Sequence, residues 1–225
     1  MKYYIYISDA KIDMLFPQVP HEIKKKTASE FKLDIKLFSA SRKTEVETEE
    51  NRIARLEAVV DFIQEYGNVG TVDDPEEYVE GNLPMRWANY SDMFEETPVV
   101  YFGAETERTI LGLGGSMKHL IGASGADIGK AHSASATPYL MRYLLKELNL
   151  HHPNAEHEKW MRLDREQGRP ELTVLDAVAL ATPQMQGPFQ NVEFLAKRLA
   201  SGQADFRELD KQVLLATPLY IATSD

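Results

Sequence analysis

The chain has 225 residues, of which 43% are hydrophobic and 9% aromatic, a composition that can build a sizeable core and excludes global disorder. Its formal net charge of −10 argues against a general coat for DNA or RNA, because an acidic protein repels nucleic-acid phosphates. It contains no cysteine, which excludes disulfides, thiolate nucleophiles and zinc–thiolate sites and suits a reducing compartment.

The N-terminal sequence shows no targeting signal. It has one basic residue and a short aromatic run that ends at Asp9, without the longer apolar stretch and small-residue cleavage site of a signal peptide. No apolar run in the chain approaches the roughly 18 residues that span a bilayer. We therefore expect a cytoplasmic protein that does not enter a membrane.

The N-terminal part is predicted to contain strands and helices in turn. Residues 2–8 are rich in tyrosine and isoleucine and predict a buried strand. Asp9 is expected to cap a helix that stops at Pro17. A second helix is predicted over 21–31, and the alternation of apolar and polar residues over 33–39 predicts a second strand.

The strongest helix signal in the chain covers residues 49–66. Its apolar residues recur at spacings of three and four, which places them on one buried face, and Gly67 ends the helix. Residues 78–90 predict a strand with Pro84 at an edge or bulge, because proline cannot donate to a sheet ladder.

A hairpin follows, with strands over Val99–Gly103 and Thr109–Leu113. Seven of the thirteen glycines lie between Gly103 and Gly129, which predicts that the hairpin runs into a glycine turn. This turn presents the densest group of chemically useful side chains in the sequence, namely Ser116, Lys118 and His119.

The C-terminal half combines a small-residue loop with further strands. Residues 122–137 are rich in glycine, serine and alanine and predict a mobile loop or a lid, followed by a helix over 138–148. The segments 178–185 and 213–220 resemble each other and predict two strands of one sheet, with another strand over 189–199. These elements lack a regular βαβ rhythm, so the expected fold is α+β, with a largely antiparallel sheet packed by several helices in a single domain over residues 1–225.

The glycine segment matches neither common phosphate-binding fingerprint. The residues around Gly112 lack the third glycine of the dinucleotide motif, and Lys130 is followed by alanine where a P-loop needs serine or threonine. A weaker prediction remains, in which backbone N–H groups form an anion nest beside a positive charge. The residues of this predicted ligand site are Gly114, Gly115, Ser116, Lys118, His119 and Arg42. A tight structural turn with incidental polar neighbours is the alternative.

His119 is the candidate catalytic residue, since Ser116 lies three residues before it and invites a nucleophile–base pair. A structural histidine is the competing interpretation, because no nearby acid in the sequence obviously orients the imidazole. Asp9, Lys11 and Asp13 follow the first strand, a common place for chemistry, although a helix cap explains Asp9 equally well. A shared site requires that these segments converge in space.

No metal site or cofactor is predicted. The only histidine cluster, His151, His152 and His157, lacks the spacing of three or four that places two metal ligands on one helix face, and Pro153 interrupts it.

Three segments resemble an uncharacterised bacterial family, a domain of unknown function. They are Tyr4–Asp13, Leu113–Gly122 and Leu215–Ala222. The resemblance spans nearly the whole chain and implies one domain in a bacterial cytoplasmic protein, with a role beside signalling or defence systems as a hypothesis. The family has no established activity, so the resemblance implies no catalytic residue.

Three functions are therefore weighed. The first is a non-catalytic module that binds a small anionic ligand or a protein partner near the glycine segment. The second is an enzyme for a phosphorylated or nucleotide-like substrate, with His119 as acid or base, Lys118 as charge stabiliser and residues 122–137 as a lid. The third is a subunit of a homo-oligomer assembled through sheet edges.

Overall fold

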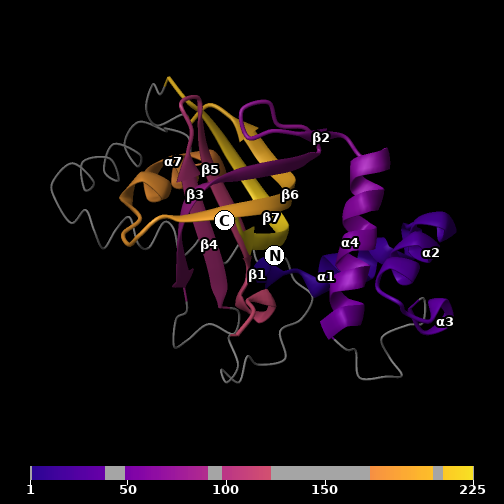
Figure 1. Ribbon diagram of the computed structural model, residues 1–225. Coiled ribbons are helices and arrows are strands. Elements are labelled where there is room, and N and C mark those ends of the chain that lie inside the picture. The colour runs from indigo at the N-terminus through magenta and orange to yellow at the C-terminus, as the bar shows by residue number, and fades with distance from the viewer. Residues whose placement is uncertain (1, 39–48, 91–97, 123–172, 205–209, 225) are drawn as a thin grey trace, which may run out of the picture.

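The fold was analysed on a computed structural model, which describes residues 2–38, 49–90, 98–122, 173–204 and 210–224 (Figure 1). Its helices are α1 (Asp9–Leu15), α2 (His21–Glu30), α3 (Ile35–Phe38), α4 (Glu49–Tyr66) and α7 (Val174–Gln184), with 3-10 turns η1 (Phe16–Gln18) and η2 (Met117–His119). Its strands are β1 (Tyr3–Ile7), β2 (Val69–Gly70), β3 (Tyr78–Tyr90), β4 (Val99–Glu105), β5 (Thr109–Ser116), β6 (Gln190–Gly202) and β7 (Gln212–Thr223). The fold is α+β, as predicted. None of the helices in these ranges is long and apolar enough to cross a membrane.

The sheet closes on itself. β3 pairs with β4, β4 with β5, β5 with β7, β7 with β6, and β6 returns to β3. Every pair in this ring is antiparallel except β5–β7, so the expected antiparallel character is confirmed. β1 joins the C-terminal part of β7, and the short β2 joins the start of β3. β1 and β2 each pair with one strand only, so they form the ends of the sheet.

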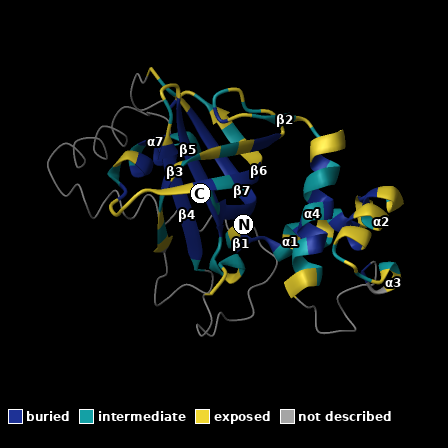
Figure 2. Ribbon diagram, viewed as in Figure 1, coloured by how far each residue is buried: buried dark blue, intermediate teal, exposed yellow. Residues whose placement is uncertain are grey.

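The ring has a packed interior and two covered outer faces. Apolar side chains from all five strands fill the interior: Val79, Met85, Val100, Phe102, Leu111, Leu113, Val192, Phe194, Leu214 and Ile221. α7 packs on the outer face of β4, β5 and β7. The N-terminal helices cover part of β6 and β7 on the opposite side (Figure 1). Figure 2 shows the consequence, since the strands are largely buried while α2 and α4 expose one side to solvent.

The predicted glycine turn is wrong, because β5 continues through this segment as far as Ser116. The glycines make room for two buried tyrosines instead. A Cβ at Gly112 would collide with the phenol of Tyr101, and one at Gly115 would collide with the phenol of Tyr6. Close packing of aromatic rings therefore explains these glycines without a turn.

The strand predicted over 33–39 is also wrong, since this segment contains the short helix α3. Asp34 begins it: its side chain accepts a hydrogen bond from the backbone N–H of Lys36 at 2.8 Å, and its carbonyl accepts one from Phe38 at 2.8 Å. The ring of Phe38 packs edge-on against Phe16, with centroids 5.1 Å apart. Local capping and this contact outweigh the alternating pattern.

The two similar C-terminal segments adopt different structures. The second forms part of β7, as predicted, with a register irregularity near Pro218. The first lies in α7, so its predicted strand is wrong. A capping box between Thr173 and Asp176 begins this helix. A hydrogen bond between the hydroxyls of Thr182 and Tyr101, which lie 2.6 Å apart, connects the helix to β4. Flanking residues therefore decide between helix and strand for nearly the same sequence.

The remaining predictions in the described ranges are confirmed. The first strand, the helices that start at Asp9 and His21, the helix over 49–66, the hairpin and the strand over 189–199 all form. In β3, Pro84 lies between the residues that pair with β2 and those that pair with β4, so its missing N–H removes no ladder bond there. The helix predicted over 138–148 and all but the first residue of the loop predicted over 122–137 lie outside the described residues.

Candidate functional site

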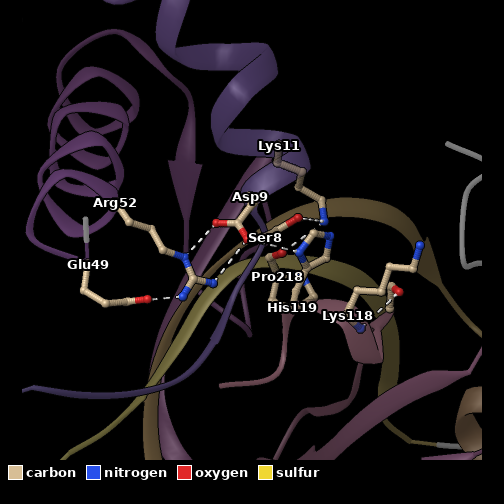
Figure 3. Close-up of polar contacts among 9 residues, drawn as sticks. Ser8, Asp9, Lys11, Glu49, Arg52, Lys118, His119 and Pro218 are labelled. Atoms are coloured by element: carbon tan, nitrogen blue, oxygen red, sulfur yellow. Dashed lines mark hydrogen bonds and ion pairs between the residues drawn. The ribbon is translucent and has the colours of Figure 1, made fainter. Parts of the chain in front are cut away.

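Polar side chains from three distant segments meet where β1 ends. Ser8, Asp9 and Lys11 come from the junction of β1 and α1, Arg52 comes from α4, and His119 comes from η2 (Figure 3). We call these five residues the β1-end cluster. Asp9 and His119, which the sequence offered as separate candidates, thus lie together.

Ser8 anchors the cluster and is 1% exposed. Its backbone N–H donates to the carbonyl of Leu219 in β7 at 2.8 Å, and its own carbonyl accepts from Ile12 at 3.0 Å. Ser8 is therefore the residue that caps α1, whereas Asp9, the predicted cap, is the first residue of the helix. The Ser8 hydroxyl makes no capping bond, although serine at this position usually does. It accepts a hydrogen bond from Lys11 instead.

Lys11 is held by two neutral oxygens. Its Nζ donates to the Ser8 hydroxyl at 3.2 Å and to the carbonyl of Pro218 at 3.0 Å. No carboxylate of the described residues pairs with it. Burial lowers the pKa of Lys11 from its usual 10.5 to about 8, because an ammonium group loses hydration there without gaining a counter-charge.

Asp9 and Arg52 form a two-point ion pair. Arg52 Nε lies 2.8 Å from Asp9 Oδ1 and Nη2 lies 3.2 Å from Oδ2, while Nη1 reaches Glu49 at 3.5 Å. The two side chains are 16% and 19% exposed, so solvent screens this pair less than a surface pair. The pair joins α1 to α4 and fixes the position of the Asp9 carboxylate.

His119 lies against that carboxylate. Its Nδ1 is 3.8 Å from Asp9 Oδ2, and this nitrogen is buried with no hydrogen-bond partner among the described residues. The imidazole also meets the ring of Tyr6 edge-on, with centroids 5.8 Å apart. The acid that the sequence did not reveal beside His119 is therefore Asp9, 110 positions earlier in the chain.

The other residues of the predicted ligand site do not join this cluster. Gly114 and Gly115 are ladder residues of β5. The Ser116 hydroxyl accepts a hydrogen bond from the backbone N–H of Lys118 at 3.3 Å, which caps η2. The side chain of Lys118 is exposed and points away from Asp9 (Figure 3). Arg42 lies outside the described residues, as do His151, His152 and His157.

Sequence reasoning missed Ser8 and Arg52. A usable signal existed in the spacing of charges: Asp9 and Asp13 are four residues apart on α1, and Arg52 and Arg55 are three apart on α4. Such spacings place each pair on one helix face. Arg55 does pair with Asp13, at 3.0 Å, beside the Asp9–Arg52 pair.

The comparison with protein families decides membership, because one family model matches residues 2–225. The chain belongs to the family of unknown function DUF7019. This confirms the resemblance to an uncharacterised family. No curated protein and no solved structure matches the chain. Membership in DUF7019 implies no activity, because the function of the family is unknown.

A separate open hollow of about 510 Å³ lies over β3 and β6 in this DUF7019 member. Its lining includes three acids, Asp73, Glu80 and Glu193, together with Thr106. A hydrogen bond from the Thr106 hydroxyl lowers the pKa of Asp73, which keeps that carboxyl ionised. Negative charge makes this hollow unsuitable for an anion, whereas the β1-end cluster carries unpaired positive charge.

The described ranges of the DUF7019 chain contain no group of three metal-ligating side chains arranged to hold a metal ion. The β1-end cluster offers an imidazole and a guanidinium beside one carboxylate, together with an amine held by Ser8 and Pro218. This set suits the binding of an anion and the transfer of a proton.

Proposed function

We propose that this protein is a binding module for a small anionic ligand, held at the β1-end cluster with Lys11 as its main contact. The observation that carries the proposal is the position of Lys11, whose amine is buried beside neutral oxygens and has no carboxylate partner among the described residues. A buried charge without a partner is costly, and an anionic ligand would supply the missing charge.

The neighbouring charges support an anion at this position. Asp9 is neutralised by the two-point contact with Arg52, so it does not cancel the charge of Lys11. His119 adds a further nitrogen donor beside them. The formal charge of the cluster is therefore +1 with a neutral His119, in a chain whose net charge is −10. We retain a cytoplasmic location as part of the proposal, since the chain lacks cysteine.

Calorimetric titration with inorganic phosphate at low ionic strength tests this proposal. Lys11→Met is expected to weaken phosphate binding by at least about tenfold, because it removes one charge-assisted hydrogen bond to the ligand. Lys118→Met is the matched control: it removes the same charge from an exposed side chain that points away from the cluster and should leave the affinity within about twofold.

Native mass spectrometry of the protein purified from cells complements the titration by detecting a bound anion of unknown identity. A stoichiometric anion that is present on the wild type and lost from Lys11→Met supports the site. Equal loss of phosphate affinity in both variants would show a general charge effect and contradict the site. Absence of phosphate binding together with a ligand-free native mass would contradict the function.

The second candidate function is catalysis on a phosphorylated or nucleotide-like substrate, with His119 as acid or base. The observation in its favour is the Asp9 carboxylate 3.8 Å from His119 Nδ1, an arrangement that can orient an imidazole for proton transfer through its other nitrogen. If it is correct, wild type should hydrolyse p-nitrophenyl phosphate. His119→Ala should then abolish turnover while the free energy of unfolding stays nearly unchanged. No turnover above that of His119→Ala would contradict it.

A further inference from the structure

The contacts of Lys11 match the hydrogen-bonding capacity of a neutral amine. An ammonium group carries three N–H donors, whereas a neutral amine carries two donors and one lone pair. Two acceptors face Nζ in the described structure, the Ser8 hydroxyl at 3.2 Å and the Pro218 carbonyl at 3.0 Å. These two contacts use both donors of the neutral form and leave its lone pair unshared. Such a lone pair is nucleophilic.

Lys11 forms no ion pair with an acid among the described residues. The closest acids in sequence, Asp9 and Asp13, each lie two positions away on α1, and they are bound by Arg52 and Arg55. Residues two apart on a helix do not face each other. Pro218, which supplies one acceptor, is buried in β7, so that acceptor is fixed by the sheet. Both partners of Nζ thus belong to the junction of β1, α1 and β7.

We propose that Lys11 captures the carbonyl group of its ligand as an imine, so that the anionic ligand of the proposed function is an aldehyde or α-keto compound. This inference rests on the proposed function, because the anionic group of the ligand is what brings its carbonyl to Lys11. The protonated fraction of Lys11 attracts the anion, and the fraction that loses its proton attacks the carbonyl carbon.

The step balances without an added oxidant or reductant. The Nζ lone pair forms a bond to the carbonyl carbon, and a proton moves from nitrogen to the carbonyl oxygen. Loss of that oxygen as water, with both hydrogens of the amine, leaves a carbon–nitrogen double bond. His119 is the side chain in the cluster that can carry the proton between nitrogen and oxygen. The Ser8 hydroxyl, which accepts from the amine, can then donate to the imine nitrogen.

Borohydride trapping with glyoxylate tests the inference. Glyoxylate is a small anionic aldehyde, and reduction of its imine leaves a stable carboxymethyl group on the lysine that reacted. The protein is incubated with glyoxylate at pH 7, reduced and digested, and each lysine is quantified by mass spectrometry. With a pKa of about 8, Lys11 holds about 300 times more neutral amine at pH 7 than a lysine at 10.5. Modification of Lys11 should exceed that of the exposed Lys118 by at least about tenfold.

Lys11→Arg separates this inference from the proposed function. Arginine keeps the positive charge and cannot form the imine, so phosphate affinity should stay within about threefold while trapping at this position disappears. Modification of Lys11 at or below the level of Lys118 in the wild type would overturn the imine. If Lys11→Met still weakens phosphate binding in that case, the anion site stands and only the covalent step fails. If phosphate binding is also absent, both proposals fail.

Discussion

Lys11→Met is expected to raise the free energy of unfolding at pH 7 by up to about 3 kcal/mol, although it removes two hydrogen bonds. The reason is the cost of holding a charged amine where burial lowers its pKa to about 8. Methionine fills a similar volume without that charge. A gain in stability on removing a side chain is typical of residues kept for binding or catalysis rather than for folding.

The pH dependence identifies the cause. Below pH 8 Lys11 is protonated in both the folded and the unfolded chain, so burial of the charged amine destabilises the folded state by its full amount. Between about 8 and 10.5 the unfolded chain binds more protons at this position, so the stability of the wild type rises with pH. The difference in the free energy of unfolding between Lys11→Met and the wild type should therefore shrink across this pH window and vanish near pH 10.5.

Urea unfolding at several pH values, followed by circular dichroism, measures this difference. The other ionisable groups of the β1-end cluster, Asp9, Arg52 and His119, are all retained in the variant. Their titration therefore largely cancels in the comparison of variant with wild type. Lys118→Met, which changes an exposed lysine, should show no such trend. If the free energies of unfolding of Lys11→Met and the wild type differ by the same amount from pH 7 to pH 10.5, burial of the charged Lys11 amine does not destabilise the fold.

Phe102→Ala is expected to lower the free energy of unfolding by about 3–5 kcal/mol. Phe102 is fully buried inside the closed ring, where its ring stacks on Trp87 at 5.8 Å and meets Tyr6 edge-on at 6.5 Å. Truncation to alanine removes this apolar burial and leaves a cavity between strands that cannot close without breaking the ring.

Urea unfolding followed by far-ultraviolet circular dichroism measures this effect, with Phe189→Ala as the control. Phe189 is 57% exposed, and its main described partner is the guanidinium of Arg86, 4.0 Å from its ring centroid. Truncation of Phe189 to alanine should lower the free energy of unfolding by less than about 1 kcal/mol. Equal losses in the two variants would contradict the assignment of Phe102 to the core.

The elements predicted correctly from sequence carry strong local signals. The helix over 49–66 has a regular apolar face and a terminal glycine, and the hairpin has two apolar runs separated by a polar turn. The errors occur where local signals are ambiguous. Alternation over 33–39 suggested a strand, but Asp34 begins a helical turn. The glycines of β5 suggested a turn, but they accommodate Tyr6 and Tyr101.

The candidate site was predicted in part. The sequence indicated His119, Asp9 and Lys11 as separate possibilities, because each lies next to a predicted strand. It did not indicate Ser8, because a hydroxyl that accepts from a lysine has no signature within its own segment. It did not indicate Arg52 either, because the matching charge spacings on α1 and α4 suggest a pair only when the two helices are compared. It also favoured Lys118 over Lys11 as the charged group, since only coordinates show that the Lys11 amine is buried against Ser8 and Pro218 while Lys118 is exposed.

The sequence by itself determined the α+β class, the helix over 49–66, most of the strands and the absence of thiol chemistry, because these follow from composition and from periodicity within short windows. Only the tertiary structure decided how the sheet closes and which polar side chains meet. Closure depends on β6 pairing with β3, more than 100 positions apart, and the β1-end cluster draws on residues from Ser8 to His119 together with the carbonyl of Pro218. Contacts over such separations are set by packing of the whole chain, which no local pattern records.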